Sequence, residues 1–374
     1  MKFVVSSAEL LDRLLLTSKV MSSKPIVEVL NNILFSVKDS KLTLMGTDLQ
    51  TTLVSEVQLP DVSEEGAIAV SKKIMDPLQN LPDQPITISV DKDENVVRMT
   101  CSAGKYDFPY CAAEEFPVIP KDEGTTKFAL SVDTLNEGIN RTLFAVGNDD
   151  MRPAMNGVYF DIHNDNLVFV ATDAHKLVRY TRNDVKAGTE SSFILPKKSA
   201  GVLKAILARE ADEASVSFNN ESVSFSFASY RLACRLIEGT FPAYNSVIPT
   251  ENQNKATINR TDLLTVVKRI STVAPAETLL VKFAFSANQV NISAQDVGFS
   301  YKGEEHLSCA YEGDELTIGF KAAYLSEMLQ TITASEVTIE MSQPDRAGLI
   351  LPVEEDDNEE TLMLLMPIRL DDAY

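Results

Sequence analysis

The chain has 374 residues with 34 basic and 54 acidic side chains, which gives a formal net charge of −20 at pH 7. At roughly 100 to 200 residues per domain, this length predicts two or three domains and excludes a single small module. A content of 44% hydrophobic and 24% charged residues is ordinary for a folded protein and does not indicate disorder. The acidic balance argues against a general affinity for nucleic acid, because phosphate binding rests on Lys and Arg.

The first residues, MKFVVSSAELLDRLLLTSKV, contain no apolar core followed by a cleavage site of small residues. No uncharged stretch approaches the ~20 residues that span a bilayer, so we predict a cytoplasmic protein without a membrane partner. Cys101, Cys111, Cys234 and Cys309 are widely spaced and form no C-x-x-C pair. They predict neither a metal site nor a disulfide framework, but small buried side chains.

Three segments of about 125 residues each follow one order of elements, which indicates an internal repeat. Each opens with a short strand and an amphipathic helix, which begins after a Ser, Asp or Thr cap and is expected within residues 6–20, 131–146 and 259–273. A hairpin is then expected within residues 31–54, 156–180 and 279–303, with KDSK, HNDN and SANQ as its turn. A second helix is expected within residues 69–81, 195–207 and 319–332.

An aspartate recurs near the end of the second hairpin strand, as Asp48, Asp173 and Asp296, and we interpret it as a turn residue. Connections rich in Pro and Gly near residues 117–125 and 242–256 mark the expected domain joints. The expected architecture is α+β, with helices against antiparallel sheet. The predicted domains are residues 1–124, 125–251 and 252–374.

Three such domains in a row leave an open strand edge at each end of the chain. An open edge is a template for pairing with another copy, and head-to-tail contacts close into a ring when the rotation permits. A linear array of domains is the alternative, and the pattern alone leaves both open.

Basic residues lie on the polar faces of the expected helices, whereas acidic residues gather in loops such as DVSEEG, READEA and EEDDNEE. A local positive surface binds phosphate even on an acidic protein, and it does so without reading the base sequence. The alternative is an ordinary solvated helix surface of mixed charge. The helix residues predicted to contact DNA are Lys19, Lys72, Lys73, Arg141, Lys197, Lys198, Lys204 and Lys268.

Five short motifs in chain order resemble the bacterial DNA sliding clamp, the beta subunit of DNA polymerase III. They are MKF at the start, GTDL around Asp48, ATDAHKL at 171–177, Phe241 with Pro242, and MPIRL at 366–370. The resemblance covers the whole chain. It implies three tandem repeats of the DNA-clamp (processivity) fold in a head-to-tail homodimeric ring, with helices lining the hole and antiparallel sheets outside.

The same resemblance implies a processivity subunit that catalyses no reaction and holds no cofactor. Such a ring encircles double-stranded DNA without sequence specificity. Its protein partners would be the polymerase catalytic subunit, an ATP-driven clamp loader and other proteins that carry a clamp-binding motif. By position, the resemblance adds Lys24 and Arg152 to the DNA contacts, and it assigns the dimer interface to Tyr106, Phe108, Thr272 and Val273.

The resemblance also implies a pocket between the second and third domains that accepts an extended peptide with apolar anchors. The matching positions are Met155, Thr172, Ala174, His175, Lys176, Leu177, Pro242, Ser246, Val247, Tyr324, Leu364, Leu365, Met366, Pro367, Ile368, Arg369 and Leu370. Methionine and leucine form an adaptable apolar surface, so one pocket is expected to serve several partners.

Some positions depart from the family pattern. Ala174 and Lys176 stand where glycine and arginine are common, Ser246 replaces a basic residue, and Lys321 replaces a polar amide. These departures leave the order of partner affinities open. Residues 371–374 extend past the usual Arg-Leu ending and add two acids beside the expected pocket.

Two other functions compete with the clamp. An enzyme would use Asp173, His175 and Lys176 as an acid/base group, but the sequence contains no G-x-S-x-G, P-loop or H-E-x-x-H motif. An acidic scaffold that never meets DNA would share the repeat and the peptide pocket. Only the positive charge on the helices distinguishes the scaffold from a clamp.

Overall fold

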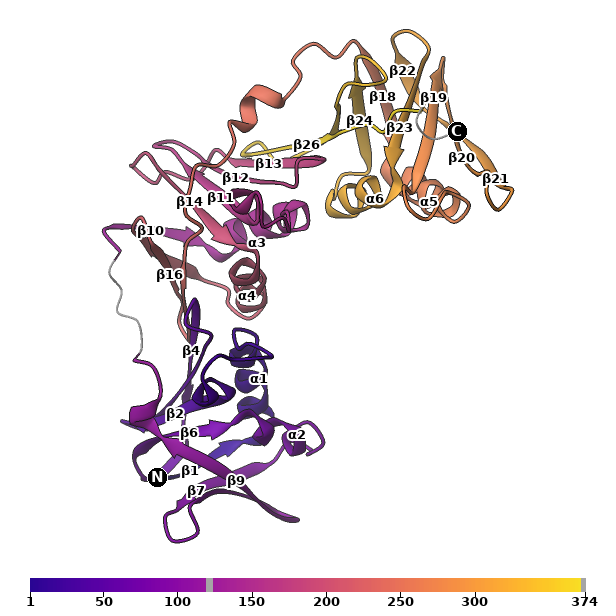
Figure 1. Ribbon diagram of the computed structural model, residues 1–374. Helices are drawn as coiled ribbons and strands as arrows, with labels where there is room; N and C mark the ends of the chain where they lie inside the picture. Colours follow the sequence, from indigo (N-terminus) through magenta and orange to yellow (C-terminus); the bar gives the residue numbers. More distant parts are fainter. Residues whose placement is uncertain (119–123, 371–374) are drawn as a thin grey trace. The chain divides into compact units, whose positions relative to one another are not determined.

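The computed structural model describes residues 1–118 and 124–370, and the terminal extension 371–374 lies outside the described residues. Figure 1 shows the helices and strands coloured along the sequence. The chain divides into two compact units, each containing two separate stretches of sequence. Unit 1 contains Met1–Asn136 and Lys198–Leu236, and unit 2 contains Glu137–Lys197 and the rest from Ile237. Every strand pair in the described part is antiparallel, as the sequence predicted.

Unit 1 is organised around one sheet of 13 strands among the described residues. In spatial order these are β10 (Thr126–Ser131), β15 (Glu213–Phe218), β16 (Ser222–Ser226), β17 (Tyr230–Arg235), β4 (Thr51–Gln58), β3 (Lys41–Thr47), β2 (Asn32–Lys38), β6 (Gly66–Ser71), β9 (Gly104–Ala112), β8 (Val96–Cys101), β7 (Pro85–Asp91), β1 (Lys2–Ser6) and β5 (Asp61–Glu64). The sheet therefore joins strands of the first and second repeats through the pairing of β4 with β17.

Two helices of unit 1, α1 and α2, belong to the first repeat. Helix α1 (Ser7–Ser18) begins at its N-cap Ser6, whose side chain accepts a hydrogen bond from the Glu9 amide. It contacts β3 and β4 with fully buried leucines, including Leu10 and Leu14. Helix α2 (Met75–Leu78) is much shorter than the predicted 69–81, because β6 and a 3₁₀ turn at Lys72–Ile74 take up the first half of that stretch.

Helices α3 and α4 belong to the second repeat, and the boundary between the two units passes through them. Helix α3 (Val132–Thr142) follows Ser131, whose hydroxyl accepts from the Thr134 amide as a cap. Helix α4 (Lys197–Leu207) carries both adjacent lysines at its start. A Cβ on Gly138 of α3 would lie 2.5 Å from the Phe169 ring, so only glycine lets the helix approach the sheet this closely.

Unit 2 contains two sheets in its described part. The nine-stranded sheet runs β14 (Ser191–Pro196), β11 (Gly157–Ile162), β12 (Leu167–Thr172), β13 (Lys176–Arg182), β26 (Glu359–Leu365), β25 (Gly348–Pro352), β24 (Glu336–Met341), β18 (Asn254–Asn259) and β22 (Ala310–Glu312). The four-stranded sheet runs β21 (Tyr301–Ser308), β20 (Gln289–Asp296), β19 (Leu280–Ser286) and β23 (Leu316–Lys321). The pairing of β13 with β26 joins the second repeat to the third.

Helices α5 (Arg260–Ser271) and α6 (Ala322–Thr331) contact each other in the third repeat. Asn259 caps α5 by accepting from the Thr261 and Asp262 amides. The described part thus contains six helices at the six predicted places, two for each repeat. In the nine-stranded sheet, Phe160 stacks on Phe193 with 4.5 Å between the ring centroids, which fixes the core of the second repeat.

The recurring aspartates are turn residues, as predicted. The Asp48 carboxylate accepts from the Gln50 and Thr51 amides, and the Asp173 carboxylate accepts from the amides of His175 and Lys176. Asp296 likewise accepts from a backbone amide three residues later. An Asx turn of this kind ends one strand and begins the next in each repeat.

Candidate functional site

The pocket predicted from the peptide-binding positions lies where β13 begins. The Thr172 hydroxyl donates to the Lys176 carbonyl (2.8 Å) and accepts from the Ala174 amide (3.1 Å). This tight turn holds Ala174 at φ +74°, a left-handed conformation that glycine adopts without strain. Glycine at position 174 would therefore adopt this turn without strain.

Strand β26 completes the wall of the pocket. It pairs with β13 so that Leu364 lies opposite Leu177, and the Met366 amide donates to the His175 carbonyl at 2.8 Å. The chain then continues to Ile368, whose amide donates to the Gly319 carbonyl. The last described residues are thus held in place by backbone hydrogen bonds rather than hanging free.

These elements enclose a mainly apolar cavity of about 210 Å³. Its lining residues are Met155, Thr172, Ala174, Lys176, Leu177, Pro242, Ala243, Tyr244, Val247, Leu364 and Met366. Met366 at 41% and Val247 at 58% are exposed at the rim, so they are free to adjust to an incoming side chain. An apolar cavity with an adaptable rim is suited to the anchor side chains of a peptide.

Nine of the predicted peptide-pocket residues line this cavity, and eight do not. Those outside it are His175, Ser246, Tyr324, Leu365, Pro367, Ile368, Arg369 and Leu370. Leu365 is fully buried in β26, and His175 stacks on Tyr324 with 6.3 Å between the ring centroids. The sequence prediction missed Ala243 and Tyr244, although both lie between the predicted Pro242 and Val247 and belong to the same turn.

Tyr244 forms part of the cavity wall and is anchored from behind. Its hydroxyl donates to the Asp161 carboxylate at 2.8 Å, and burial raises the pKa of the phenol, so the donor proton is kept. His163 lies near the same Asp161 oxygen, with its Nε2 3.5 Å from that atom and its Nδ1 2.8 Å from Glu190. The hydrogen bond to Glu190 raises the pKa of His163.

Lys176 is a buried cation at the edge of the cavity. Only 6% of its side chain is exposed, and its Nζ lies 2.8 Å from the Glu327 carboxylate of α6 and 3.5 Å from that of Asp173. The same Nζ lies 4.3 Å from the centre of the Tyr324 ring. A second ring, that of Phe144, has its centre 5.7 Å from Nζ, so two carboxylates and two aromatic rings hold the charge.

The geometry does not support an acid/base group at this turn. One Asp173 oxygen accepts two backbone amides and the other faces Lys176, while the His175 ring stacks on Tyr324. Asp173 and His175 thus act in the turn and in ring packing. Among the described residues, no group of three or more His, Cys, Asp or Glu side chains is placed to hold a metal ion.

The cysteines agree only in part with the prediction that they are small buried side chains. All four cysteines are free; Cys234 and Cys309 are buried, as expected, whereas Cys101 and Cys111 are half-buried. In the part of the chain that the structure describes, no helix is long and apolar enough to cross a membrane.

Most of the residues predicted to contact DNA are exposed. Lys19, Lys24, Lys73, Arg152, Lys197, Lys198, Lys204 and Lys268 are exposed, and Lys72 is half-buried. Three of them make a contact within the protein: Arg152 pairs with Asp149, Lys198 with Asp48, and Lys197 donates to a backbone carbonyl. Lys204 and Lys268 have no carboxylate partner among the described residues.

Arg141 is a correction to the predicted DNA contacts. Only 10% of its side chain is exposed, and its guanidinium pairs with Glu137, Glu355 and Glu359. It also lies over the Tyr180 ring, with 4.8 Å from its central carbon to the ring centroid. A guanidinium buried among three carboxylates is not available to a phosphate, so Arg141 instead holds the acidic loop 354–360 against α3.

The predicted dimer-interface residues lie at two strand edges, one in each unit. Within the described residues, residues 104–109 of β9 pair with β8 alone, and β6 reaches β9 at residues 110–112. Tyr106 and Phe108 lie opposite the buried Met99 and Val97, so apolar side chains of the core face reach this open edge.

In unit 2, β21 is an edge strand whose described pairing is with β20 alone. Val273, at the end of α5, packs against this strand: a Cβ on Gly303 would lie 2.8 Å from its Cγ2. Thr272 beside it is exposed. Both edges therefore combine unpaired backbone groups with nearby apolar side chains, which is the arrangement that favours strand addition.

Comparison with known proteins gives matches along almost the whole chain. Models of the DNA polymerase III beta subunit match residues 1–120 with the N-terminal domain, 129–243 with the central domain and 245–369 with the C-terminal domain. The beta sliding clamps of Haemophilus influenzae and Synechocystis sp. are 29% and 28% identical, over 99% of this chain and all of theirs.

Solved structures give the same result. A sliding clamp from Pseudomonas aeruginosa bound to griselimycin superposes with a TM-score of 0.93 at 26% identity, over 99% of this chain and 100% of that one. The DNA polymerase III beta subunit of Thermotoga maritima gives a TM-score of 0.91 at 25% identity, with 99% of each chain covered.

Proposed function

The chain belongs to the DNA polymerase III beta subunit family, the bacterial sliding clamps, and we propose that two copies close into a ring around duplex DNA. It has the three-domain clamp fold, and it acts as a processivity factor of DNA replication rather than as an enzyme. The proposal concerns how these residues close the ring, meet DNA and hold partner proteins. We propose domain boundaries at residues 1–124, 125–251 and 252–374, and the cytoplasm as the place of action.

The observation that carries the ring is the pair of open strand edges at β9 and β21. If β9 of one copy pairs with β21 of another, both unpaired backbone edges receive hydrogen-bond partners. Tyr106 and Phe108 of one copy would then pack near Thr272 and Val273 of its partner. Because each copy offers both of these edges, two copies joined head to tail pair all four of them.

DNA inside such a ring is proposed to contact the exposed basic side chains through its phosphates, without base-specific recognition. Lys204 on α4 and Lys268 on α5 support this role, because neither is engaged by a carboxylate in the described part. Lys19, Lys24, Lys72, Lys73, Arg152, Lys197 and Lys198 complete the proposed set. Phosphate contacts of this kind carry no base information and permit sliding, while the acidic remainder of the surface repels DNA.

Partner proteins are proposed to dock through the cavity beside β13 and β26. Its lining of Leu177, Val247, Leu364 and Met366 suits the apolar anchors of an extended peptide. The polymerase catalytic subunit, the clamp loader and other proteins with the same kind of motif would compete for it. Removing residues 366–370 is expected to abolish binding of a polymerase peptide while leaving the ring mass at twice 41.1 kDa.

The decisive experiment compares retention on closed and open DNA. The protein is loaded by an ATP-driven clamp loader onto a nicked circular plasmid, washed in high salt, and then exposed to a restriction enzyme that linearises the plasmid. Topological retention predicts survival of the salt wash and release after cutting, whereas a phosphate-bound protein dissociates in salt from both forms. Equal loss from circular and linear DNA would refute the encircling ring.

A further inference from the structure

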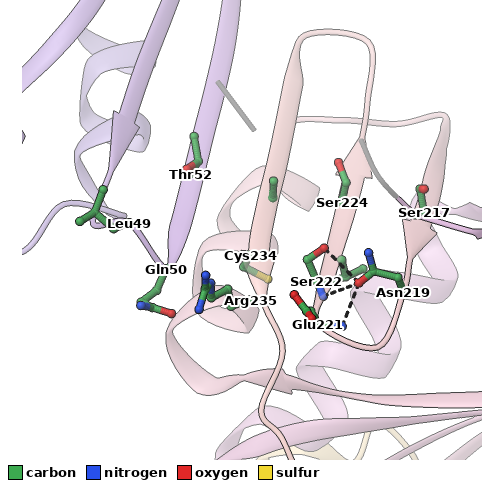
Figure 2. A pocket seen from close by; sticks show the side chains of 13 residues that line it. Leu49, Gln50, Thr52, Ser217, Asn219, Glu221, Ser222, Ser224, Cys234 and Arg235 are labelled. Carbon is green, nitrogen blue, oxygen red and sulfur yellow. Dashed lines mark hydrogen bonds between the residues drawn. The ribbon is translucent and has the colours of Figure 1, made fainter. Parts of the chain in front are cut away.

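Unit 1 contains a second cavity, of about 290 Å³, beside β4 and β17 (Figure 2). Its wall is formed mostly by polar side chains and small residues from four neighbouring strands and the turns that join them. They are Leu49, Gln50, Thr52, Gly124, Ser217, Asn219, Glu221, Ser222, Val223, Ser224, Ala233, Cys234 and Arg235. No role in ring closure, DNA contact or apolar anchoring accounts for this cavity.

The turn at its edge repeats the turn of the peptide pocket atom for atom. The Thr47 hydroxyl donates to the Thr51 carbonyl and accepts from the Leu49 amide, as Thr172 does in its own turn. Leu49 has φ +73°, against +74° for Ala174. The two cavities are therefore built on the same backbone frame, one repeat apart.

The adjoining strand repeats as well. Strand β17 pairs with β4 so that Ala233 lies opposite Thr52, in the way that Leu364 of β26 lies opposite Leu177. The Arg235 amide donates to the Gln50 carbonyl at 2.9 Å, as the Met366 amide donates to the His175 carbonyl at 2.8 Å. Arg235 thus occupies the place of Met366 in the frame.

The side chains on this frame have the opposite chemistry. Thr52, Ala233 and Arg235 stand at the positions of two leucines and a methionine. Thr52, Ala233, Ser224 and Ser217 lie opposite one another across β4, β17, β16 and β15, which makes a row of small and hydroxyl side chains on one face of the sheet. A groove of this kind does not suit an apolar anchor but offers hydroxyl donors to a polar one.

A polar ligand in this cavity would meet two side chains, Ser224 and Arg235. The Ser224 hydroxyl is buried, with 7% of the residue exposed, and it has no hydrogen-bond partner among the described residues. A buried hydroxyl without a partner costs free energy, so a bound acceptor is an expected reason for its presence. Arg235 is exposed and has no carboxylate partner among the described residues, although it lines the same cavity.

We propose that this cavity is a second peptide-binding groove, which takes an extended segment of a partner protein through an acidic side chain. The carboxylate of that side chain would pair with Arg235 and accept from the hydroxyl row that includes Ser224. Glu221 lines the same cavity and disfavours a phosphate, whose charge is about −2, more than a single carboxylate. The interpretation as a peptide groove depends on the proposed apolar peptide pocket, which has the same backbone arrangement. The choice of an acidic ligand depends on Ser224 and Arg235.

The test uses the full-length protein and a fluorescein-labelled peptide of alternating serine and aspartate, followed by fluorescence anisotropy. Arg235→Glu is expected to weaken binding at least about tenfold, the usual scale of a lost charge-assisted pair. Arg346→Glu, the same change at an exposed arginine in unit 2, should leave binding unchanged. Glu221→Gln should tighten binding, because it removes the opposing charge.

Ser224→Ala separates a ligand-binding hydroxyl from a structural one. It is expected to weaken the peptide about threefold and to raise the midpoint of thermal unfolding of the free protein, since the buried unpartnered hydroxyl is gone. A polymerase peptide should bind all four variants with the affinity of the parent protein, which separates this groove from the apolar pocket.

Three outcomes would overturn the proposal. The first is equal loss of acidic-peptide binding in Arg235→Glu and Arg346→Glu, and the second is no measurable binding of the acidic peptide to the parent protein. The third is binding of a labelled ten-nucleotide single strand that depends on Arg235 while the peptide does not bind. A polymerase peptide that failed to bind the parent protein would instead count against the apolar pocket alone.

Discussion

Lys176 of β13 and Glu327 of α6 form an ion pair of 2.8 Å at the edge of the apolar pocket, and the lysine end of the pair is almost fully buried. The pair joins the strand of one repeat to the helix of the next. Glu327→Gln is expected to lower the free energy of unfolding by about 1 kcal/mol, because the buried lysine loses its nearer carboxylate. The loss stays small because Asp173, at 3.5 Å, still faces the lysine. Urea unfolding followed by circular dichroism measures the change.

The matched control for this pair is Glu315→Gln, at an exposed glutamate with no partner among the described residues. The double variant Lys176→Met with Glu327→Gln should be more stable than Glu327→Gln alone, since no buried charge is left without its partner. Additive effects of the two changes would show that the ion pair contributes nothing to stability.

Ala174 has a left-handed backbone conformation, with φ +74°, in the turn that begins the pocket. Ala174→Gly is expected to raise the free energy of unfolding by up to about 1 kcal/mol, because the relief of the strained backbone exceeds the added freedom of the unfolded chain. Leu49→Gly tests the same turn in unit 1, although that change also removes an apolar side chain. Ala154→Gly serves as the control, since Ala154 has no positive φ; a gain there equal to that at position 174 would contradict the explanation.

The turns and helix starts were readable from the sequence because their causes are local. An aspartate that accepts the amides two and three residues ahead needs no distant partner, and neither does the Ser6 cap of α1. The burial of Arg141 was not readable, since two of its carboxylate partners, Glu355 and Glu359, follow it by more than 200 residues. Its place on a helix with a polar face predicted a DNA contact that the fold does not allow.

The pocket also depends on contacts between residues that are distant in the sequence. Apolar residues near Pro242 and Met366 were predicted through resemblance, but Tyr244, which also forms the wall, is held by a hydrogen bond that its hydroxyl donates to Asp161 of β11, 83 residues earlier. The polar cavity of unit 1 was not predicted, because its repeat relation to the apolar pocket lies in backbone hydrogen bonds and not in side-chain identity. Strand register, which decides both cavities, depends on pairing across more than 150 residues.

Phe108 is placed at the open edge of β9 with its ring on the core face. Phe108→Asp is expected to convert the dimer into a monomer of 41.1 kDa at micromolar concentration, because a carboxylate replaces an apolar contact in the proposed interface. Sedimentation velocity measures the mass. Val353→Asp, at an exposed valine that belongs to neither β9 nor β21, should leave the dimer intact. A dimer that survives Phe108→Asp would argue against pairing at β9.

Lys204 and Lys268 are exposed cations that the described residues do not neutralise. Changing both to Glu is expected to weaken binding to duplex DNA and to reduce the slope of log affinity against log salt by about one for each lysine. Filter binding at several salt concentrations gives that slope. Lys92→Glu in an exposed loop is the control for net charge, and Arg141→Leu should leave DNA binding unchanged, since its guanidinium is buried among carboxylates.

His163 gives the protein a stability component that depends on pH. The hydrogen bond to Glu190 raises its folded-state pKa above the value of about 6.5 found in unfolded chains. The imidazolium therefore stabilises the fold fully below that unfolded pKa, and the contribution is lost as the pH rises through the folded pKa.

His163→Gln is accordingly expected to destabilise the protein more at pH 5.5 than at pH 8.5, values chosen as about one unit below and two above the unfolded pKa. Urea midpoints of the parent and variant at both values measure the difference. Since the ring is 40% exposed, the effect should be small and should shrink further in high salt. Glu190→Gln removes the carboxylate that raises the pKa of His163, so it should abolish most of the pH-dependent difference in stability. If the difference between the parent and His163→Gln is instead constant with pH, His163 acts through packing and not through its charge.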